Sequence, residues 1–147
     1  FALDFIHSDR SIFKIVDLDE AWAFLNVAQG ETLSNKLVRA GRAMNAGVYF
    51  VTQSSGDVSK ESLKNNIGLK FAFRSTDTNE IKQTLEFFGL DSEDENNQKR
   101  LRDLENGQCL LQDLYGRVGV VQIHPVFVEL LHAFDTRPPI KSEVDLE

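Results

Sequence analysis

Two adjacent carboxylates, Asp19 and Glu20, follow a short apolar segment near the start of the chain and are the residues best suited to chemistry. The segment from Ser11 to Leu18 is mostly apolar and β-branched, which predicts a short buried strand. Because α/β sheets bind ligands at the carboxyl ends of their strands, both acids would face a ligand. In a nucleotide site Asp19 would hold Mg²⁺ through its water shell, and Glu20 would orient and deprotonate the attacking water. Acids that merely end a strand are commoner, and Asp17 inside the strand needs a partner or an exposed face.

A polar amide, Gln53, comes directly after the next predicted strand, which spans Val48 to Thr52. Such an amide can reach the γ-phosphate or the attacking water and report whether ATP is intact, although an ordinary strand exit has the same sequence. The serines that follow, Ser54 and Ser55, do not predict a hydrolase triad, because no histidine lies in a recognisable elbow or triad context. The histidines are His7, His124 and His132. They form no H-E-x-x-H pair or Cys/His cluster, so a zinc or iron site is not predicted.

Three arginines are candidates for contacting phosphate. Arg39 and Arg42 are spaced i, i+3 and would share one face of a predicted helix, with Arg39 as a candidate for binding the nucleotide. Arg74 follows a predicted strand. A guanidinium presents a fixed fork of donors that suits phosphate, and an arginine from a neighbouring subunit can stabilise the charge of phosphoryl transfer. Most arginines on a helix are simply solvated, so the spacing alone leaves both interpretations open.

The elements that must position these residues follow from the hydrophobic pattern. In the first half the pattern predicts a strand, two helices and a second strand, with Gly30 ending the first helix and Gly47 lying just past the second. This order implies a right-handed crossover between two parallel strands. The predicted ranges are 11–18 and 48–52 for the strands and 21–27 and 32–45 for the helices.

The second half of the chain predicts further short helices, a third strand and a β-hairpin. Thr76 or Asp77 can cap a helix that Gly89 ends. Its inner stripe would be Ile81, Leu85 and Phe88. The other expected ranges are helices at 59–66, 92–104 and 126–134, a strand at 69–73, and hairpin strands at 108–114 and 117–123. The fold class is therefore α/β, with a parallel sheet core, a carboxy-terminal antiparallel hairpin and flanking helices.

Composition and charge restrict the function classes. The chain has 147 residues, a net charge of −7 and one cysteine, Cys109, whose apolar surroundings predict a buried thiol. No apolar run approaches the ~20 residues of a membrane span. The acidic balance argues against a surface built to coat nucleic acid, and the acidic run from Asp91 to Glu95 is best explained as a solvated helix start. The phosphate-binding pattern G-x-x-x-x-G-K-S/T does not occur in the sequence, and Gly116 to Gly119 predicts a hairpin turn rather than a phosphate cradle.

Five segments together resemble the conjugation and type IV secretion ATPases of the VirB-four/TraC family, especially those of Gram-positive conjugative elements. The segments are KIVDLDEAWAF at 14–24, RAGRAMNAGVYFVTQS at 39–54, KFAFRS at 70–75, GQCLLQDLYGRVGVV at 107–121 and HAFDTRP at 132–138. The resemblance implies that residues 1–139 are the carboxy-terminal part of a RecA-like domain of the P-loop NTPase fold, without its phosphate-binding loop. Residues 140–147 would be a tail, and its last two residues have the form of a cloning remnant.

The resemblance also assigns roles to individual residues. In this family the acids matching Asp19 and Glu20 form the Walker B site of an enzyme that uses ATP and Mg²⁺. The arginine matching Arg42 and the glutamine matching Gln53 line the catalytic site. The arginine matching Arg74 is a candidate for contacting nucleotide across a hexamer interface.

The cellular role implied by the resemblance is that of a homo-hexameric motor in the cytoplasm, peripheral to the inner face of the cell membrane. It would work with the inner-membrane subunits of a secretion channel. The isolated chain, without a phosphate loop, is expected to be inactive. Two alternatives remain: a DNA translocase or coupling protein of the same superfamily, whose DNA partner the charge does not support, and a non-catalytic oligomerisation module for the isolated chain.

Overall fold

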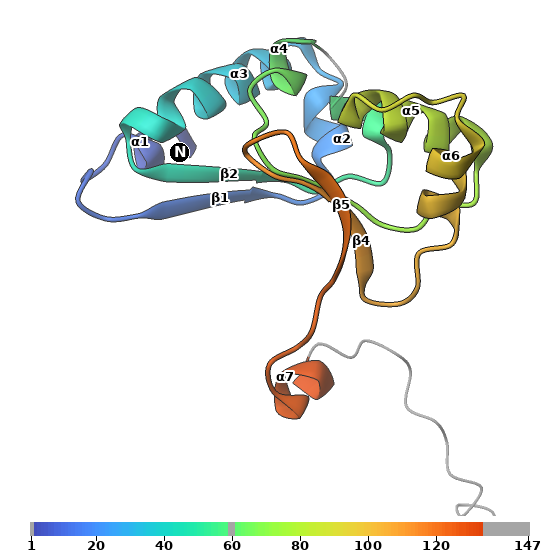
Figure 1. The fold of residues 1–147 in the computed structure, drawn as a ribbon. Helices are drawn as coiled ribbons and strands as arrows, with labels where there is room; N and C mark the ends of the chain where they lie inside the picture. The colour runs from blue at the N-terminus through green and yellow to red at the C-terminus, as the bar shows by residue number, and fades with distance from the viewer. Residues whose placement is uncertain (1, 59–60, 134–147) are drawn as a thin grey trace, which may run out of the picture.

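The computed structural model describes residues 2–58 and 61–133, and within these ranges it leaves a few side chains undescribed, that of Arg42 among them. Two separate sheets organise the chain (Figure 1). A parallel pair consists of β1 (Lys14–Leu18) and β2 (Ala46–Phe50). An antiparallel sheet has the order β3 (Lys70–Ala72), β4 (Gln108–Gln112), β5 (Val118–Gln122). The helices are α1 (Ala2–Ile6), α2 (Ala21–Leu25), α3 (Ala28–Ala43), η1 (Ser55–Val58), α4 (Glu61–Lys64), α5 (Thr78–Phe88), α6 (Glu95–Arg102) and α7 (Val128–Ala133).

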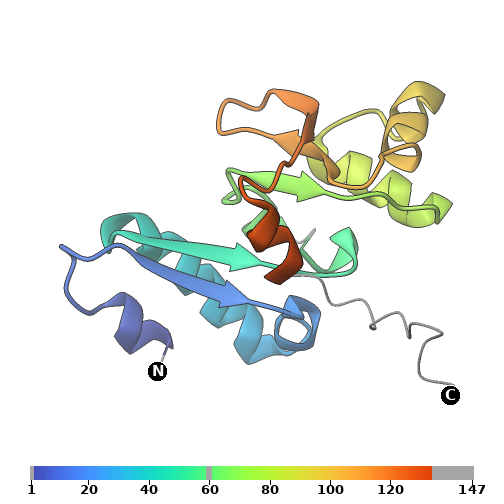
Figure 2. The same ribbon diagram turned by 90° about the horizontal axis from the view of Figure 1, so that it is seen from below.

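The parallel pair confirms the predicted crossover, but it is covered on one face only. In Figure 1, α1 and α3 lie above β1 and β2. Figure 2 looks from below and shows the two strands in front of α3, so the helices cover the upper face of the pair. Side chains alternate accordingly, because successive residues of a strand point to opposite faces. Leu18 and Phe50 pack against the core, whereas Ile15 is 50% and Tyr49 52% exposed. The prediction of a buried strand from Ser11 is therefore wrong in its first three residues and on its open face.

The ends of α3 also differ from the prediction. Gly30 does not end a helix; it lies in the first turn of α3, where its carbonyl oxygen accepts a 2.9 Å hydrogen bond from Ser34 Oγ. The break falls instead at Val27, whose extended backbone precedes the helix. Asn45, with φ 53°, takes the left-handed position after α3 that the sequence assigned to Gly47. Asparagine tolerates this conformation better than most residues, so the following strand can begin at Ala46, two residues earlier than predicted.

Close contact between α3 and β2 depends on Gly41. A Cβ at this position would lie 2.8 Å from the carbonyl oxygen of Ala46, a backbone atom that cannot rotate away. We therefore expect Gly41→Ala to lower the free energy of unfolding by about 1–3 kcal/mol, as overpacking does, even though alanine has the better helix propensity. Urea unfolding measures the effect. The matched control is Gly119→Ala in β5, where nothing lies within 4 Å of the added Cβ and where a change within about 0.5 kcal/mol is expected. Equal stabilities of the two variants would contradict this account of the packing.

The main hydrophobic core is built mostly by α2, α4, α5 and α6, and residues of both sheets pack against it. The predicted stripe on α5 is confirmed, with Ile81 and Leu85 fully buried and Phe88 3% exposed. Asp77 is the N-cap, and its carboxylate accepts a 2.8 Å hydrogen bond from the backbone N–H of Glu80, while Gly89 ends the helix with φ 73°. The whole cluster comprises Ala21, Leu25, Val58, Leu63, Ile81, Leu85, Phe87, Phe88, Leu101, Leu104 and Leu110.

The third predicted strand joins the hairpin and not the parallel pair. Phe71 of β3 is in register with Leu111 of β4, in antiparallel orientation. Two donors from this sheet satisfy the last carbonyl groups of α5: Lys70 Nζ donates to Phe87 O at 2.7 Å and Gln112 Nε2 to Phe88 O at 3.0 Å. Such groups otherwise have no partner within a helix. The sheet is thereby attached to the carboxyl end of α5.

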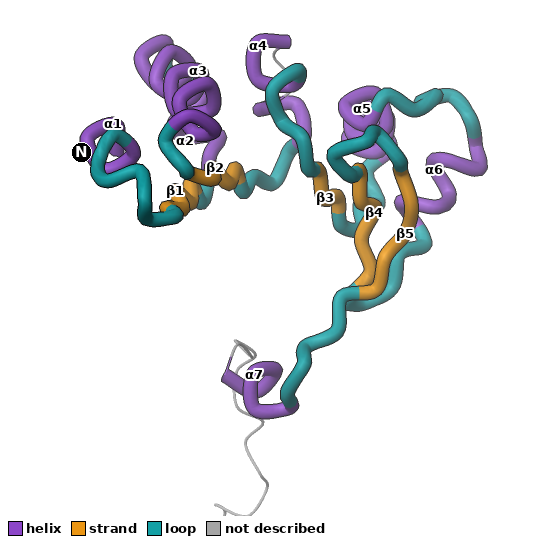
Figure 3. Tube along the Cα trace, turned by 60° about the vertical axis from the view of Figure 1, so that its left-hand side comes forward, coloured by secondary structure: helices purple, strands orange, loops and turns teal. Residues whose placement is uncertain are grey.

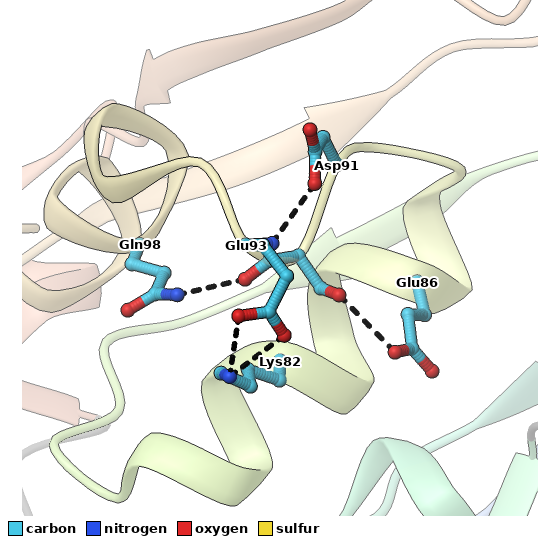
Figure 4. Close-up of polar contacts among 6 residues, drawn as sticks. Lys82, Glu86, Asp91, Glu93 and Gln98 are labelled. Carbon is cyan, nitrogen blue, oxygen red and sulfur yellow. Dashed lines mark hydrogen bonds and ion pairs between the residues drawn. The ribbon is translucent and has the colours of Figure 1, made fainter.

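The acidic run between α5 and α6 is a structured connection (Figure 4). Lys82 Nζ of α5 forms an ion pair with both carboxylate oxygens of Glu93, at 2.7 and 2.8 Å. Ser92 Oγ donates to Glu86 at 3.2 Å, and Gln98 Nε2 donates to Ser92 O at 2.7 Å. The predicted helix at 92–104 therefore begins only at Glu95, because the residues before it bind back to α5.

The end of the described chain leaves the body of the molecule. Figures 1 and 3 show α7 well away from the two sheets, and its apolar residues Val128 and Leu131 are 64% and 55% exposed. By contrast, Cys109 in β4 is fully buried, as predicted, and burial raises the pKa of its thiol. Over the part of the chain that the structure describes, no helix has the length and hydropathy needed to cross a membrane.

Candidate functional site

Asp19 and Glu20 lie at the junction between β1 and α2, beside the end of β2. Two backbone hydrogen bonds hold this junction to Val51: Val51 N–H donates to Leu18 O at 3.0 Å, and Ala21 N–H donates to Val51 O at 2.9 Å. The regular parallel register ends at Leu18 and Phe50, because the N–H that donates to Val51 O is that of Ala21 and not that of Glu20. Both acids are exposed. They are not turned inward among apolar side chains, so their carboxylates are accessible to a ligand.

The carboxylate of Glu20 is held from two sides. Its Oε1 accepts a 3.3 Å hydrogen bond from Gln53 Nε2, and its Oε2 accepts one from the indole N–H of Trp22 at 2.5 Å. The contact with Gln53 joins residues 33 positions apart, as the meeting of two strand exits predicts. The role of Trp22 was missed by the sequence analysis, although its place two residues after the acid could have indicated it.

The backbone of Glu20 is in an unusual conformation. Its φ of 52° and ψ of 44° lie in the left-handed region, which costs a residue with a side chain roughly 1–3 kcal/mol. The preceding Asp19 stabilises this turn, since its Oδ1 accepts a 2.9 Å hydrogen bond from the Glu20 N–H. Such outliers persist where the surroundings fix them, and they concentrate at functional sites. Both residues of this turn are exposed.

The arginines on α3 are placed elsewhere. Arg42 follows Gly41, which lies against Ala46 at the beginning of β2, in register with Lys14 at the beginning of β1. The four residue steps of β1 span about 13 Å, so the backbone of Arg42 lies near the opposite end of the strands from the acids. Arg39, one turn earlier, is exposed. The structure thus brings Glu20 and Gln53 together but does not place Arg42 in the same site within one chain.

Arg74 lies in the connection between β3 and α5. It is exposed and precedes the N-cap Asp77 by three residues. The first turn of this helix reaches back to the segment after Gln53: the carboxylate of Glu80 accepts hydrogen bonds from Ser54 Oγ at 2.8 Å and from Ser55 N–H at 2.7 Å. Glu80 was not predicted as a site residue, because nothing in the sequence relates it to Ser55, which lies 25 positions earlier.

The donor set suits Mg²⁺ better than a transition metal. Carboxylate oxygens of Asp19 and Glu20 and the amide oxygen of Gln53 are hard ligands of the kind that Mg²⁺ prefers. Among residues 2–58 and 61–133 no group of three or more His, Cys, Asp or Glu residues could hold a metal ion. A magnesium ion bound through one or two carboxylates, water and phosphate oxygens does not require such a group. Asp19 would hold the ion, which supplies charge neutralisation for phosphate oxygens when bound.

Comparison with known proteins assigns a family. The family model described as AAA-like domain matches residues 1–134, more than nine-tenths of the chain. The uncharacterized protein YddE of Bacillus subtilis (strain 168) is 34% identical over 119 residues. That match covers 81% of this chain and only 14% of YddE. The chain therefore spans about one-seventh of the length of this relative.

Solved structures agree on the fold. The DNA-packaging ATPase from Sulfolobus Turreted Icosahedral Virus superposes with a TM-score of 0.59 at 16% identity, over 76% of this chain and 52% of that one. The genome packaging NTPase from Sulfolobus turreted icosahedral virus 2, in complex with ATP-gammaS, gives 0.57 at 15% identity over the same shares. At such identities the likeness concerns the fold alone. With its mixed α/β architecture, a parallel pair and an antiparallel sheet, the chain belongs to the AAA-like domain family and has part of the P-loop ATPase fold.

Proposed function

We propose that the chain is the part of an ATP-hydrolysing motor that carries its Walker B acids. The observation that carries this proposal is the contact between Glu20 Oε1 and Gln53 Nε2 at the exits of two parallel strands. Asp19 would hold Mg²⁺, Glu20 would orient and deprotonate the attacking water, and Gln53 would contact the water or the γ-phosphate. Phosphate-loop residues would come from outside the 147 residues, whose sequence lacks that pattern.

The motor that we propose serves a conjugative type IV secretion system. The resemblance of the five segments to the VirB-four/TraC family supports this role, and it implies a cytoplasmic hexamer at the inner face of the membrane beside channel subunits. The position of Arg42 fits such an assembly. Its backbone lies near the start of β1, and the acids of the same chain follow the other end of this strand, which is about 13 Å long. An arginine placed in this way is better suited to contact the site of a neighbouring subunit. Arg39 and Arg74, both exposed, are further candidates for this contact in trans.

A second candidate function is DNA translocation. It is favoured by the similarity of the fold to two viral ATPases whose names state DNA or genome packaging. The net charge of −7 does not favour it, since duplex-binding surfaces are normally basic. ATP hydrolysis that DNA stimulates, and that falls steeply as salt rises from 50 to 200 mM, would favour the translocase, because phosphate contacts release counterions.

The test of the main proposal uses the full-length protein. We expect it to hydrolyse ATP with Mg²⁺ and to lose turnover when EDTA removes the ion, because the metal neutralises charge on the phosphates. Phosphate release measured with and without Mg²⁺ checks this expectation. The isolated 147-residue chain, used as a control, should bind labelled ATP at best very weakly and would then be only an assembly module. Micromolar binding by the isolated chain would contradict the view that its site is incomplete, and a full-length protein without turnover would rule out the motor.

A further inference from the structure

The carboxylate of Glu80 holds the segment that follows Gln53 against α5. Glu80, in the first turn of α5, accepts three hydrogen bonds from consecutive residues: Ser54 Oγ at 2.8 Å, Ser55 N–H at 2.7 Å and Ser55 Oγ at 2.9 Å. Ser55 is the first residue of η1, so the carboxylate also caps the positive end of that short helix. Hydrogen bonds to a charged acceptor are stronger than those between neutral groups.

Further contacts make this attachment rigid. Thr84, one turn after Glu80 and 5% exposed, has its hydroxyl 3.2 Å from Ser55 Oγ and 3.4 Å from Glu80 Oε1, so its one O–H can donate to either acceptor. On the other side of Gln53, Thr52 Oγ1 donates to Asp57 Oδ2 at 2.7 Å. Gln53 itself is exposed, and its amide donates to Glu20. Its side chain is therefore accessible from solvent, while its neighbours are held by hydrogen bonds.

We infer that Glu80 is a positioning residue, which holds the Gln53 segment against the Glu20 carboxylate by binding Ser54 and Ser55. The inference rests on the proposed function of Glu20 and Gln53. Through α5, Glu80 also connects the Gln53 segment to the loop that carries Arg74, since Asp77, the N-cap of the same helix, follows Arg74 by three residues. A displacement of α5 would move the Gln53 segment with it.

The experiment compares three variants of the full-length protein. Glu80→Ala removes all acceptors for Ser54 and Ser55, whereas Glu80→Gln keeps an oxygen for Ser55 and leaves an amide to which the Ser54 hydroxyl can act as acceptor. Glu86→Ala is the matched control, because this glutamate is exposed on the same helix and its carboxylate accepts a hydrogen bond from Ser92, on the side of α6. The hydrogen bond from Lys64 to Glu86 goes to the backbone oxygen, which alanine keeps. Steady-state ATP hydrolysis gives kcat and KM. Hydrogen exchange followed by mass spectrometry gives the protection of the peptide around residues 53–57.

We expect Glu80→Ala to lower kcat about 10- to 100-fold with KM for ATP changed less than about threefold, because misplacing a catalytic group by about 1 Å has an effect of that size. Glu80→Gln should recover most of the loss, and Glu86→Ala should stay within about twofold of the wild type. The exchange of residues 53–57 should become much faster in Glu80→Ala and slightly faster in Glu80→Gln, because a neutral amide makes weaker hydrogen bonds than a carboxylate. In Glu86→Ala it should not change.

Three results separate the possible errors. A cooperatively folded Glu80→Ala protein with wild-type kcat and unchanged exchange would overturn the inference. If Glu80→Ala does not fold, Glu80→Gln decides: faster exchange with a partial loss of kcat supports the positioning role, and wild-type behaviour in both measurements overturns it. A wild-type protein that hydrolyses no ATP refutes the proposed function instead, while the exchange measurement still shows whether Glu80 holds this segment.

Discussion

Replacing Glu20 with glutamine in the full-length protein is expected to lower kcat for ATP hydrolysis by about 10²- to 10⁴-fold, the usual contribution of a general base. The amide keeps the shape of the side chain and can still accept the hydrogen bond from Gln53 through its oxygen, but it cannot take a proton from water. Nucleotide affinity should change little, because binding depends mainly on the phosphate loop and Mg²⁺. Single-turnover hydrolysis and binding of a fluorescent nucleotide measure the two quantities separately.

The matched control for this variant is Asp17→Asn. Asp17 is an exposed carboxylate in β1, two residues before Asp19, and alternation directs it to the open face of the sheet. Its kcat should remain within about twofold of the wild type. Retained turnover in Glu20→Gln would remove Glu20 from the mechanism, and equal losses in both variants would point to a general effect of charge on this strand.

Truncation of Leu85 to alanine is expected to lower the free energy of unfolding by about 2–5 kcal/mol. Leu85 is fully buried on α5, in the cluster that joins α2, α5 and β4. The loss combines the transfer of the removed methyl groups to water with the cavity that remains, because the neighbouring helices can close it only in part. Chemical denaturation measures the difference in free energy of unfolding between the variant and the wild type, provided that both have the same m-value.

The same substitution at Leu114 provides the comparison. This leucine is 72% exposed in the turn of the hairpin, so Leu114→Ala should change stability by no more than about 0.5 kcal/mol. A loss at Leu85 of less than about 1 kcal/mol would mean that the cluster relaxes freely. The hydrophobic core around α5 would then not be the close-packed unit that the burial of Leu85 indicates.

Local signals in the sequence predicted the elements that local chemistry determines. Asp77 and Gly89 bracket α5 as expected, because a carboxylate cap and a left-handed glycine act on groups a few residues away. The hairpin around Gly116 is confirmed for the same reason. The meeting of Glu20 and Gln53 also followed from the sequence, since the carboxyl ends of neighbouring parallel strands share one edge.

Features that depend on packing were not predictable in this way. The sequence around Gly30 is typical of a helix end, but in the structure this glycine is buried in the first turn of α3, and the helix continues past it. The pairing of β3 with β4 and the contact of Glu80 with Ser55 join residues that are far apart in sequence, so no local pattern encodes them. The distance of Arg42 from the acids results from the direction of α3, which spacing within the helix cannot reveal.

The left-handed backbone of Glu20 has a consequence for engineering. Glycine adopts φ near 52° without strain, so a screen that selects only for thermostability would tend to enrich Glu20→Gly. That exchange would relax the turn and delete the carboxylate in one step. Under the roles proposed above, heat resistance and turnover oppose each other at this single position, and stabilised versions of the protein should be designed with residue 20 held constant.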